Sequence, residues 1–313
     1  MKNKKCDLCS NEDFKFLFKN YDRMYGIPGE FNLVRCKNCG LVFIYPYLNK
    51  NEIAKYYPKE KYYSMIKNPV EDFKIKLYNI FYSENRFAKK LLFAPFKFLV
   101  RKIIIQKGGN FLDVGCGDGK FLKIIEKSGM YCYGVEPNIS KSIIEEKLKI
   151  FNCELEEAKF KKEFFDVITL NHVFEHVASP SHTLREINRI LKKGGYVVIA
   201  TPNIGSLTAR IFGSKWFQLD TPRHLFLYSE KTIAKYAKKE GFKIEKITYN
   251  STPLQFLCSM VYVLNQFRYK ENILLNESGI PTNKFLLACF LPAAYVFNIL
   301  KLGDQFEIVL HKK

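Results

Sequence analysis

From about residue 108 to the C-terminus, short β-rich runs alternate with segments that favour helices. The strand-like runs are NFLDVG, YCYGVEPN, FDVITLNHV and YVVIATPN, and the helical segments between them are KFLKIIEKSG, SKSIIEEKLK and PSHTLREINRILKKGG. Strands and helices that alternate in this way form a parallel sheet covered by helices on both faces. We therefore expect one α/β domain over residues 108–313.

The end of this domain follows a different pattern. A predicted helix SEKTIAKYAKKEG and a strand FKIEKITYN are followed by an apolar helical insertion, residues 252–302, and by a last strand DQFEIVLHK. The longest apolar run, Phe285 to Leu300, is shorter than the ~18 residues that a membrane-spanning helix needs. Because Pro292 interrupts this run, we expect a buried or interfacial helix pair.

Residues 46–107 are rich in tyrosine, phenylalanine and lysine. Their apolar run RFAKKLLFAPFKFLVRKIII favours helices with an interruption at Pro95. Aromatic residues interleaved with lysines can line a nucleic-acid groove, but they more often pack on a neighbouring domain while the charges face water. We expect a helical connector.

Two C-x-x-C pairs lie in residues 1–45. Cys6 and Cys9 are separated by 26 residues from Cys36 and Cys39. Four thiolates spaced in this way can surround one tetrahedral Zn²⁺, and a site closed by four cysteines is structural because no position is left for water. We expect a small zinc-ribbon-like module. The odd cysteine total and the lysine-rich start without a signal peptide favour a reducing cytoplasm.

The formal net charge of +19 has two interpretations. It would attract nucleic acid, an anionic membrane surface or a phosphorylated substrate. It also fits lysines scattered among Asn, Ile, Phe and Tyr, as an AT-rich genome would produce. Because no arginine-rich tract or RNA-binding aromatic signature accompanies the charge, we do not expect a nucleic-acid partner.

Three glycines follow the first predicted strand of the α/β domain. Gly115, Gly117 and Gly119 leave bare backbone at the carboxyl edge of the sheet, where open α/β sheets bind their ligands. A dinucleotide fingerprint would have a third glycine at Lys120. Asp113 suits a ligand that carries an ammonium group better than a pyrophosphate. A ligand other than a dinucleotide is therefore indicated.

Glu136 lies 21 residues after Gly115, at the end of the second predicted strand. A carboxylate at this place can accept hydrogen bonds from both hydroxyls of a ribose. The ligand is therefore expected to contain a ribose and no diphosphate.

These motifs together resemble the class I S-adenosylmethionine-dependent methyltransferases. LDVGCGDGKFL is similar to their first motif and GVEPN to their second, while FDVITLNHVFEHV and LREINRILKKGGYVVIATPN are similar to the fourth-strand and fifth-strand motifs. The resemblance extends from about Gly108 to the C-terminus and implies a Rossmann-like seven-stranded sheet. WFQLDTPRHLFLYSEKTIAKYAKKEGF resembles a bacterial subgroup with an N-terminal zinc-ribbon-like segment, which is associated with modifying sugars, glycans or lipid-linked cell-surface material.

The resemblance also implies roles for individual residues around the cofactor. The three glycines would hold the methionine moiety, Asp113 would lie near its ammonium group, and Glu136 would bind the ribose. In ELEEA, which departs from the commoner Gly-Asp pattern of the family, Glu156, Glu157 or Ala158 would border the adenine through backbone or side-chain groups. Asn171 and His172 would lie close to the sulfonium and its methyl group.

His172, Glu175 and His176 fall on one face of a helical turn in NHVFEHV. One histidine can act as a general base, or the three groups can bind a divalent metal, or they can form a hydrogen-bonded structural cluster. Related ubiquinone-pathway O-methyltransferases and small-RNA 3′-end methyltransferases have a glutamate at the position of His172. Neutral imidazole suits softer metals than Mg²⁺, which weakens the analogy with these enzymes.

The loop after the fifth predicted strand carries Trp216, Asp220, Arg223 and His224. Such loops supply substrate contacts, so His224 is a second candidate base and Arg223 a candidate for gripping a phosphate or carboxylate of the acceptor. In the alternative interpretation, these polar groups hold the loop itself.

We therefore expect a cytoplasmic enzyme that transfers a methyl group from S-adenosylmethionine to a small-molecule or lipid-linked acceptor, foremost a sugar or glycan. Contact with the inner face of the membrane is a further expectation, based on the apolar insertion and the excess of lysine. An RNA methyltransferase and a non-catalytic cofactor-binding protein are the alternatives. The acceptor atom and the oligomeric state are left open.

Overall fold

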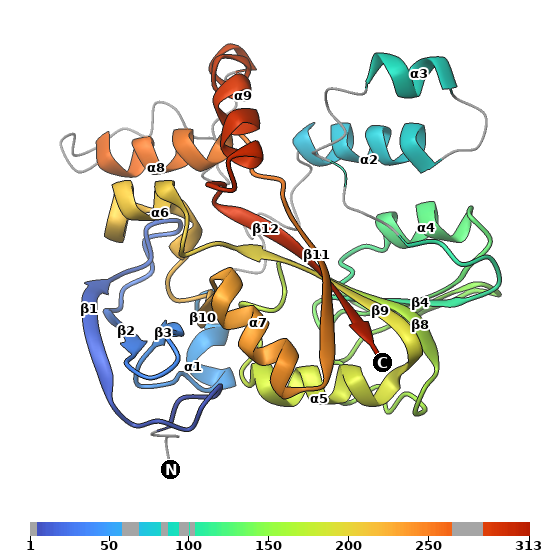
Figure 1. Cartoon of the computed structure of the whole chain (residues 1–313), viewed down its shortest axis with the longest axis horizontal. Coiled ribbons are helices and arrows are strands. Elements are labelled where there is room, and N and C mark those ends of the chain that lie inside the picture. The colour runs from blue at the N-terminus through green and yellow to red at the C-terminus, as the bar shows by residue number, and fades with distance from the viewer. Residues whose placement is uncertain (1–4, 58–68, 83–86, 94–99, 101–103, 265–283) are drawn as a thin grey trace.

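The computed structural model describes residues 5–57, 69–82, 87–93, 100, 104–264 and 284–313 (Figure 1). Within these residues the strands form two sheets. The larger has eight strands in the order β11-β12-β9-β8-β4-β5-β7-β6, and the smaller has four in the order β1-β2-β3-β10.

The larger sheet confirms the predicted α/β fold, with eight strands where the resemblance implied seven. Its strands are β4 (Asn110–Val114), β5 (Tyr131–Val135), β6 (Ile143–Ile144), β7 (Leu148–Phe151), β8 (Phe165–Asn171), β9 (Leu191–Pro202), β11 (Phe242–Tyr249) and β12 (Gln305–Lys312). The central strands β7, β5, β4, β8 and β9 run parallel, whereas β12 is antiparallel to both β9 and β11. The carboxyl ends of the parallel strands therefore share one edge.

Segment SKSIIEEKLK is not the helix that the sequence pattern predicted. Its residues form β6 and the start of β7, which pair antiparallel with Ile143 opposite Ile150. The amide of Glu145 donates to the carbonyl of Leu148 and closes the turn between the two strands. Leu148 and Ile150 are fully buried beside β5. Burial of these β7 side chains in the sheet outweighs the helix propensity of the lysines and glutamates.

Helices cover both faces of the larger sheet (Figure 1). On one face α5 (Pro180–Ile190) and α7 (Glu230–Lys239) contribute Leu184, Ile187 and Ile233 to the main hydrophobic cluster. On the other face, Leu122 and Ile125 of α4 (Lys120–Glu126) pack with residues of β4, β5 and β7. The remaining helices are α1 (Lys50–Ala54), α2 (Pro69–Tyr82), α3 (Phe87–Leu92), α6 (Leu207–Phe212), α8 (Leu254–Leu264) and α9 (Lys284–Ile299), with short 3₁₀ turns η3 (Gly213–Lys215) and η4 (Phe217–Leu219).

The apolar run near the C-terminus forms one helix, α9, and not the predicted helix pair. The helix continues through Pro292, and rings before and after this proline, Phe290 and Phe297, both contact Phe256 of α8. This shared support holds the two halves in line. The helix is also not buried, since the exposed fraction of Phe285 is 74%. Among the described residues, no helix combines the length and apolar character needed to cross a membrane.

The smaller sheet joins the cysteine-containing segment to the rest of the protein. It consists of β1 (Phe14–Asn20), β2 (Phe31–Cys36), β3 (Val42–Ile44) and β10 (Phe226–Leu227). Because β10 pairs antiparallel with β3, this sheet receives its last strand from the α/β domain. Phe43 and Phe226 also belong to the same hydrophobic cluster. The domain boundaries expected at residues 45 and 107 stay predictions, and Pro95 lies outside the described residues.

The first C-x-x-C turn is docked on the α/β domain through Asp7. Its carboxylate accepts hydrogen bonds from the backbone amide of Ser181, 2.9 Å away at the start of α5, and from the hydroxyl of Tyr236, 2.9 Å away on α7. Lys239 of α7 donates to the carbonyl of Leu8 at 3.0 Å. The cysteine-containing segment is therefore held by polar contacts as well as by the shared core.

Candidate cofactor and acceptor site

The glycine loop after β4 adopts backbone conformations that favour glycine. Gly115, Gly117 and Gly119 have φ angles of +69°, +55° and +74°. A Cβ on Gly115 would clash with Val173, and one on Gly119 would clash with Ile150, whereas a Cβ on Gly117 would meet nothing within 4 Å. Packing therefore requires glycine at position 115, the left-handed backbone favours it at position 119, and Gly117 leaves open space in which a ligand can approach the backbone.

Two acidic side chains lie at the same sheet edge. Glu136 directly follows β5, and its Oε2 accepts a hydrogen bond from the backbone amide of Gly117 at 3.2 Å. Its Oε1 accepts from the backbone amide of Asn138 at 3.0 Å, which orients the carboxylate toward the glycine loop. Asp113 is buried and accepts a hydrogen bond from Thr169 Oγ1 at 2.6 Å. The structure thus brings together Asp113, the glycines and Glu136.

The side chains of Glu156 and Glu157 are engaged elsewhere. Thr183 of α5 donates to Glu156 Oε1 at 3.2 Å. Glu157 Oε2 accepts from the backbone amide of Glu154 at 2.9 Å and closes its own turn. Because both carboxylates already accept hydrogen bonds within the protein, the backbone of this segment is the better candidate for bordering an adenine ring.

Beyond Asn171, the last residue of β8, the chain turns sharply at His172, whose φ is +52°. The Nδ1 atom of His172 lies 3.2 Å from Oε1 of Glu175. Glu175 is fully buried, and its Oε2 accepts a hydrogen bond from Thr201 Oγ1 of β9 at 3.1 Å. This cluster adjoins the glycine loop, because the next residue, Val173, is the one that packs against Gly115.

The structure also brings His224 to this cluster, although it lies on a separate loop. The ring centroids of His176 and His224 are 4.7 Å apart, and His224 Nε2 lies 3.9 Å from Glu175 Oε1. Two groups that we did not single out in the sequence complete the cluster. They are Thr201 and Tyr57, whose hydroxyl lies 3.0 Å from His176 Nδ1. Tyr57 had no distinguishing signal within the aromatic run KYYPKEKYY.

Burial and mutual contacts set the protonation of this cluster. Burial raises the pKa of Glu175, but the hydrogen bond from His172 and the electrostatic interactions with His172 and His224 outweigh it and hold the pKa at about 2. Burial is the main cause that lowers the pKa of His176 to about 4, and His224 lowers it further. At neutral pH the cluster therefore combines a buried carboxylate with a neutral His176 imidazole.

A family model described as a methyltransferase domain matches residues 82–247. The chain belongs to the class I S-adenosylmethionine-dependent methyltransferases. This assignment agrees with the strand order of the larger sheet and makes the chain an enzyme, so the non-catalytic alternative is not retained.

Similar proteins differ in what their names say they act on. The methyltransferase is 26% identical over 165 residues to a ubiquinone biosynthesis O-methyltransferase of Coxiella burnetii, covering 48% of the chain and 70% of the relative. It is 26% identical over 147 residues to a tRNA U34 carboxymethyltransferase of Desulfotalea psychrophila, covering 44% of the chain and 46% of the relative. The chain matches only 53% of the length of a relative from Methanocaldococcus jannaschii.

Solved structures also resemble the methyltransferase. The crystal structure of a SAM-dependent methyltransferase from Archaeoglobus fulgidus has 18% sequence identity and a TM-score of 0.45, and covers 76% of this chain and 99% of that one.

Arg223 and Trp216 lie in the interior of the methyltransferase. The guanidinium of Arg223 is fully buried and donates to Asp220 at 2.6 Å, to Asp22 at 2.8 Å and to the carbonyl of Tyr56 at 3.0 Å. Trp216 is buried with Leu219 and its neighbours in a small apolar cluster. Neither side chain presents a surface to an acceptor. The contacts of Arg223 favour the interpretation in which the loop is held by its own polar groups.

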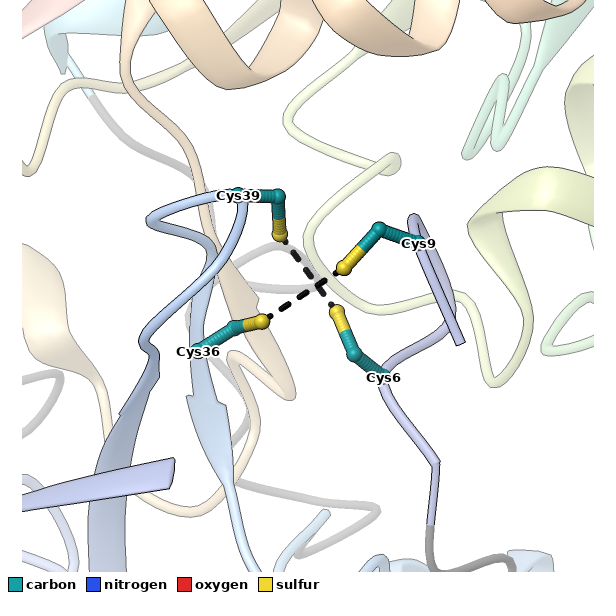
Figure 2. Close-up of side chains that lie close together, drawn as sticks. All are labelled: Cys6, Cys9, Cys36 and Cys39. Atoms are coloured by element: carbon teal, nitrogen blue, oxygen red, sulfur yellow. Dashed lines mark hydrogen bonds between the residues drawn. The ribbon is translucent and has the colours of Figure 1, made fainter. Parts of the chain in front are cut away.

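The four predicted metal ligands converge from two turns (Figure 2). The Sγ atoms of Cys6 and Cys39 are 3.5 Å apart, as are those of Cys9 and Cys36, and each is a free cysteine. Four ligands at the Zn–S distance of about 2.3 Å would place tetrahedral sulfur atoms ~3.8 Å apart. Gly40, with a φ of +83°, lets the second turn close behind Cys39. The residues therefore fit a four-thiolate zinc site.

Proposed function

We propose that this methyltransferase transfers the methyl group of S-adenosylmethionine to a small-molecule acceptor, namely a sugar, a glycan or a lipid-linked cell-surface precursor. The observation that carries the proposal is the proximity of two features at one sheet edge. The glycine loop is open at Gly117 and held by Glu136, and the adjoining turn bears a partly exposed histidine, His172. The acceptor class is supported by the resemblance of the segment around Trp216 to the sugar-modifying subgroup.

His172 is the histidine best placed to accept a proton from the acceptor. The exposed fraction of its side chain is 31%, against 3% for His224. With Nδ1 facing the carboxylate of Glu175, the neutral ring donates its proton there and keeps Nε2 free to act as a base. We therefore assign His172 as the general base and Glu175 as the residue that positions it.

Around the cofactor, each residue has a binding role in this proposal. Bound S-adenosylmethionine supplies an electrophilic methyl group. Glu136 accepts hydrogen bonds from the ribose hydroxyls, the backbone at Gly117 lets the methionine moiety approach, and Asp113 counters its ammonium group. The chain's main contribution to the rate is then alignment of the acceptor beside the methyl group.

Replacing Glu136 with alanine is expected to weaken binding of S-adenosylhomocysteine roughly 10- to 100-fold, because hydrogen bonds to a charged group contribute about 1.5–3 kcal/mol. Isothermal calorimetry with the purified chain measures this change. Glu146, an exposed glutamate between β6 and β7, provides the control, and Glu146→Ala should bind as the wild type does. Equal affinity in Glu136→Ala would refute the ribose contact, and no binding by the wild type would refute the cofactor assignment.

RNA is the rival acceptor, suggested by the net charge of +19 and by the name of one relative. If RNA were the substrate, its affinity would fall steeply as salt rises, because binding releases counterions from the phosphates. We expect no such RNA binding at physiological salt. Steeply salt-dependent binding of tRNA would indicate that the acceptor is RNA and not a small molecule.

We also propose that Cys6, Cys9, Cys36 and Cys39 hold one structural Zn²⁺, supported by the convergence of their sulfur atoms. The cytoplasmic location and contact with the inner face of the membrane stay predictions.

A further inference from the structure

We propose that Glu175, His176 and His224 form a second metal site, separate from the four cysteines, for a divalent transition ion. One ligand atom from each of these residues lies within 4.8 Å of the others. The sequence pattern had suggested His172 as the third member of such a set, and the structure provides His224 instead. Three protein ligands leave a coordination position for a further ligand, as in catalytic rather than structural sites.

The two imidazoles are oriented as metal-binding histidines are. His224 Nδ1 lies 2.8 Å from the carbonyl oxygen of Gln218, which can only accept, so Nδ1 is the donor and Nε2 is the ring nitrogen left to bind a metal. That Nε2 lies 3.9 Å from Glu175 Oε1. His176 Nδ1 is 3.0 Å from the carbonyl oxygen of Arg223. Hydrogen bonds from the second ring nitrogen to backbone carbonyls are typical of histidines that bind metals.

The charges around the cluster favour a cation. Glu175 is fully buried, and a buried carboxylate requires a positive partner. Arg223 does not supply it, because its guanidinium is shared by two buried carboxylates, those of Asp22 and Asp220. The basic groups beside Glu175 are imidazoles, with His172 Nδ1 3.2 Å and His224 Nε2 3.9 Å from its Oε1. Asp220 Oδ2 also lies 3.9 Å from His224 Nε2, which adds to the negative potential there. A divalent ion between Glu175 and the two imidazoles would balance this excess.

The ligand set indicates which ions fit. One carboxylate and two imidazoles suit Mn²⁺, Fe²⁺, Co²⁺ or Zn²⁺ better than Mg²⁺ or Ca²⁺, which prefer oxygen ligands. The site adjoins Val173, which packs against the glycine loop. Its place beside the cofactor edge would favour acceptors that offer an oxygen ligand, such as a hydroxyl or a carboxylate. This role rests on the proposed function, whereas metal binding itself does not.

Titration with Mn²⁺ of the chain that carries a single equivalent of Zn²⁺, which the four thiolates bind first, tests the site through the loss of the free-ion electron paramagnetic resonance signal. Zinc on the cysteines and the preference of Mn²⁺ for oxygen and nitrogen keep the two sites apart. We expect about one Mn²⁺ per chain. Loss of an outer-shell partner already weakens metal binding about 10- to 100-fold, so removing a ligand should weaken it more than ~100-fold.

Two conservative variants make the test specific. Glu175→Gln keeps the size of the side chain, and His224→Asn keeps an N–H donor for the carbonyl of Gln218, so both are expected to lose Mn²⁺ while unfolding at a temperature close to that of the wild type. His182→Asn, at an exposed histidine, is the matched control and should keep the ion.

If neither Mn²⁺ nor Co²⁺ binds to a wild-type chain that binds S-adenosylhomocysteine, the metal site is refuted and the proposed function is not. Binding that survives in both variants also refutes the metal site. Failure of the proposed function would instead show as Mn²⁺ binding without S-adenosylhomocysteine binding.

Discussion

Replacing Arg223 with methionine is expected to lower the free energy of unfolding by about 3–5 kcal/mol, the usual cost of breaking a buried ion pair by removing one partner. The guanidinium is fully buried between Asp22 and Asp220 and donates to both. Methionine fills a similar volume but leaves two carboxylates without a cation. Urea denaturation, monitored by circular dichroism, measures the loss as a lower midpoint.

Arg185 provides a matched control for this prediction. Its side chain is 64% exposed, and its Nε lies 3.6 Å from Glu240 Oε2. Because exposed ion pairs contribute about 0–1 kcal/mol, Arg185→Met should unfold close to the wild type. An Arg223→Met chain with an unchanged midpoint would show that Asp22 and Asp220 need no cation. It would also remove the support for a loop held by its own polar groups.

The glycine loop could be predicted from the sequence because its signal is local. Gly115, Gly117 and Gly119 follow a strand directly, and a left-handed backbone is accessible to glycine at little cost. Glu136 was predictable for a related reason, since it ends the neighbouring strand and parallel strands end at one edge. Residue type and strand order alone determine this part of the site.

Contacts between distant segments left no comparable signal. Asp22 and Arg223 are 201 residues apart, and nothing around Asp22 marks it as a buried ion-pair partner. The approach of His224 to Glu175 depends on the fold of the intervening loop. The turn with Glu175 and the loop with His224, which the sequence presented as separate candidates, therefore form one cluster. The hairpin of β6 and β7 shows the same limit, because the helical pattern of SKSIIEEKLK was outweighed by pairing with β5.

Replacing Cys39 with serine is expected to remove the zinc and to destabilise the whole chain, because the cysteines lie in the main hydrophobic cluster. Cys39 and Phe43 share that cluster with Phe226 and Tyr236 of the α/β domain. Structural zinc contributes about 10–16 kcal/mol to folding in zinc-finger peptides, which is comparable to the ~5–15 kcal/mol total stability of a typical domain. Loss of the ion should therefore release β3 from β10 and expose part of the shared core.

Atomic absorption and urea denaturation measure both effects. Zinc is best counted in a Glu175→Gln background, where the second proposed site is disabled, and we expect about one Zn²⁺ per chain before the Cys39→Ser change and almost none after it. Cys289, an exposed cysteine of α9, supplies the control, since Cys289→Ser should keep both the zinc and the midpoint. Zinc retained by Cys39→Ser would refute the four-thiolate site. Loss of zinc with an unchanged midpoint would instead mean that β10 and the shared core suffice to hold the segment, so the metal would serve local geometry and not global stability.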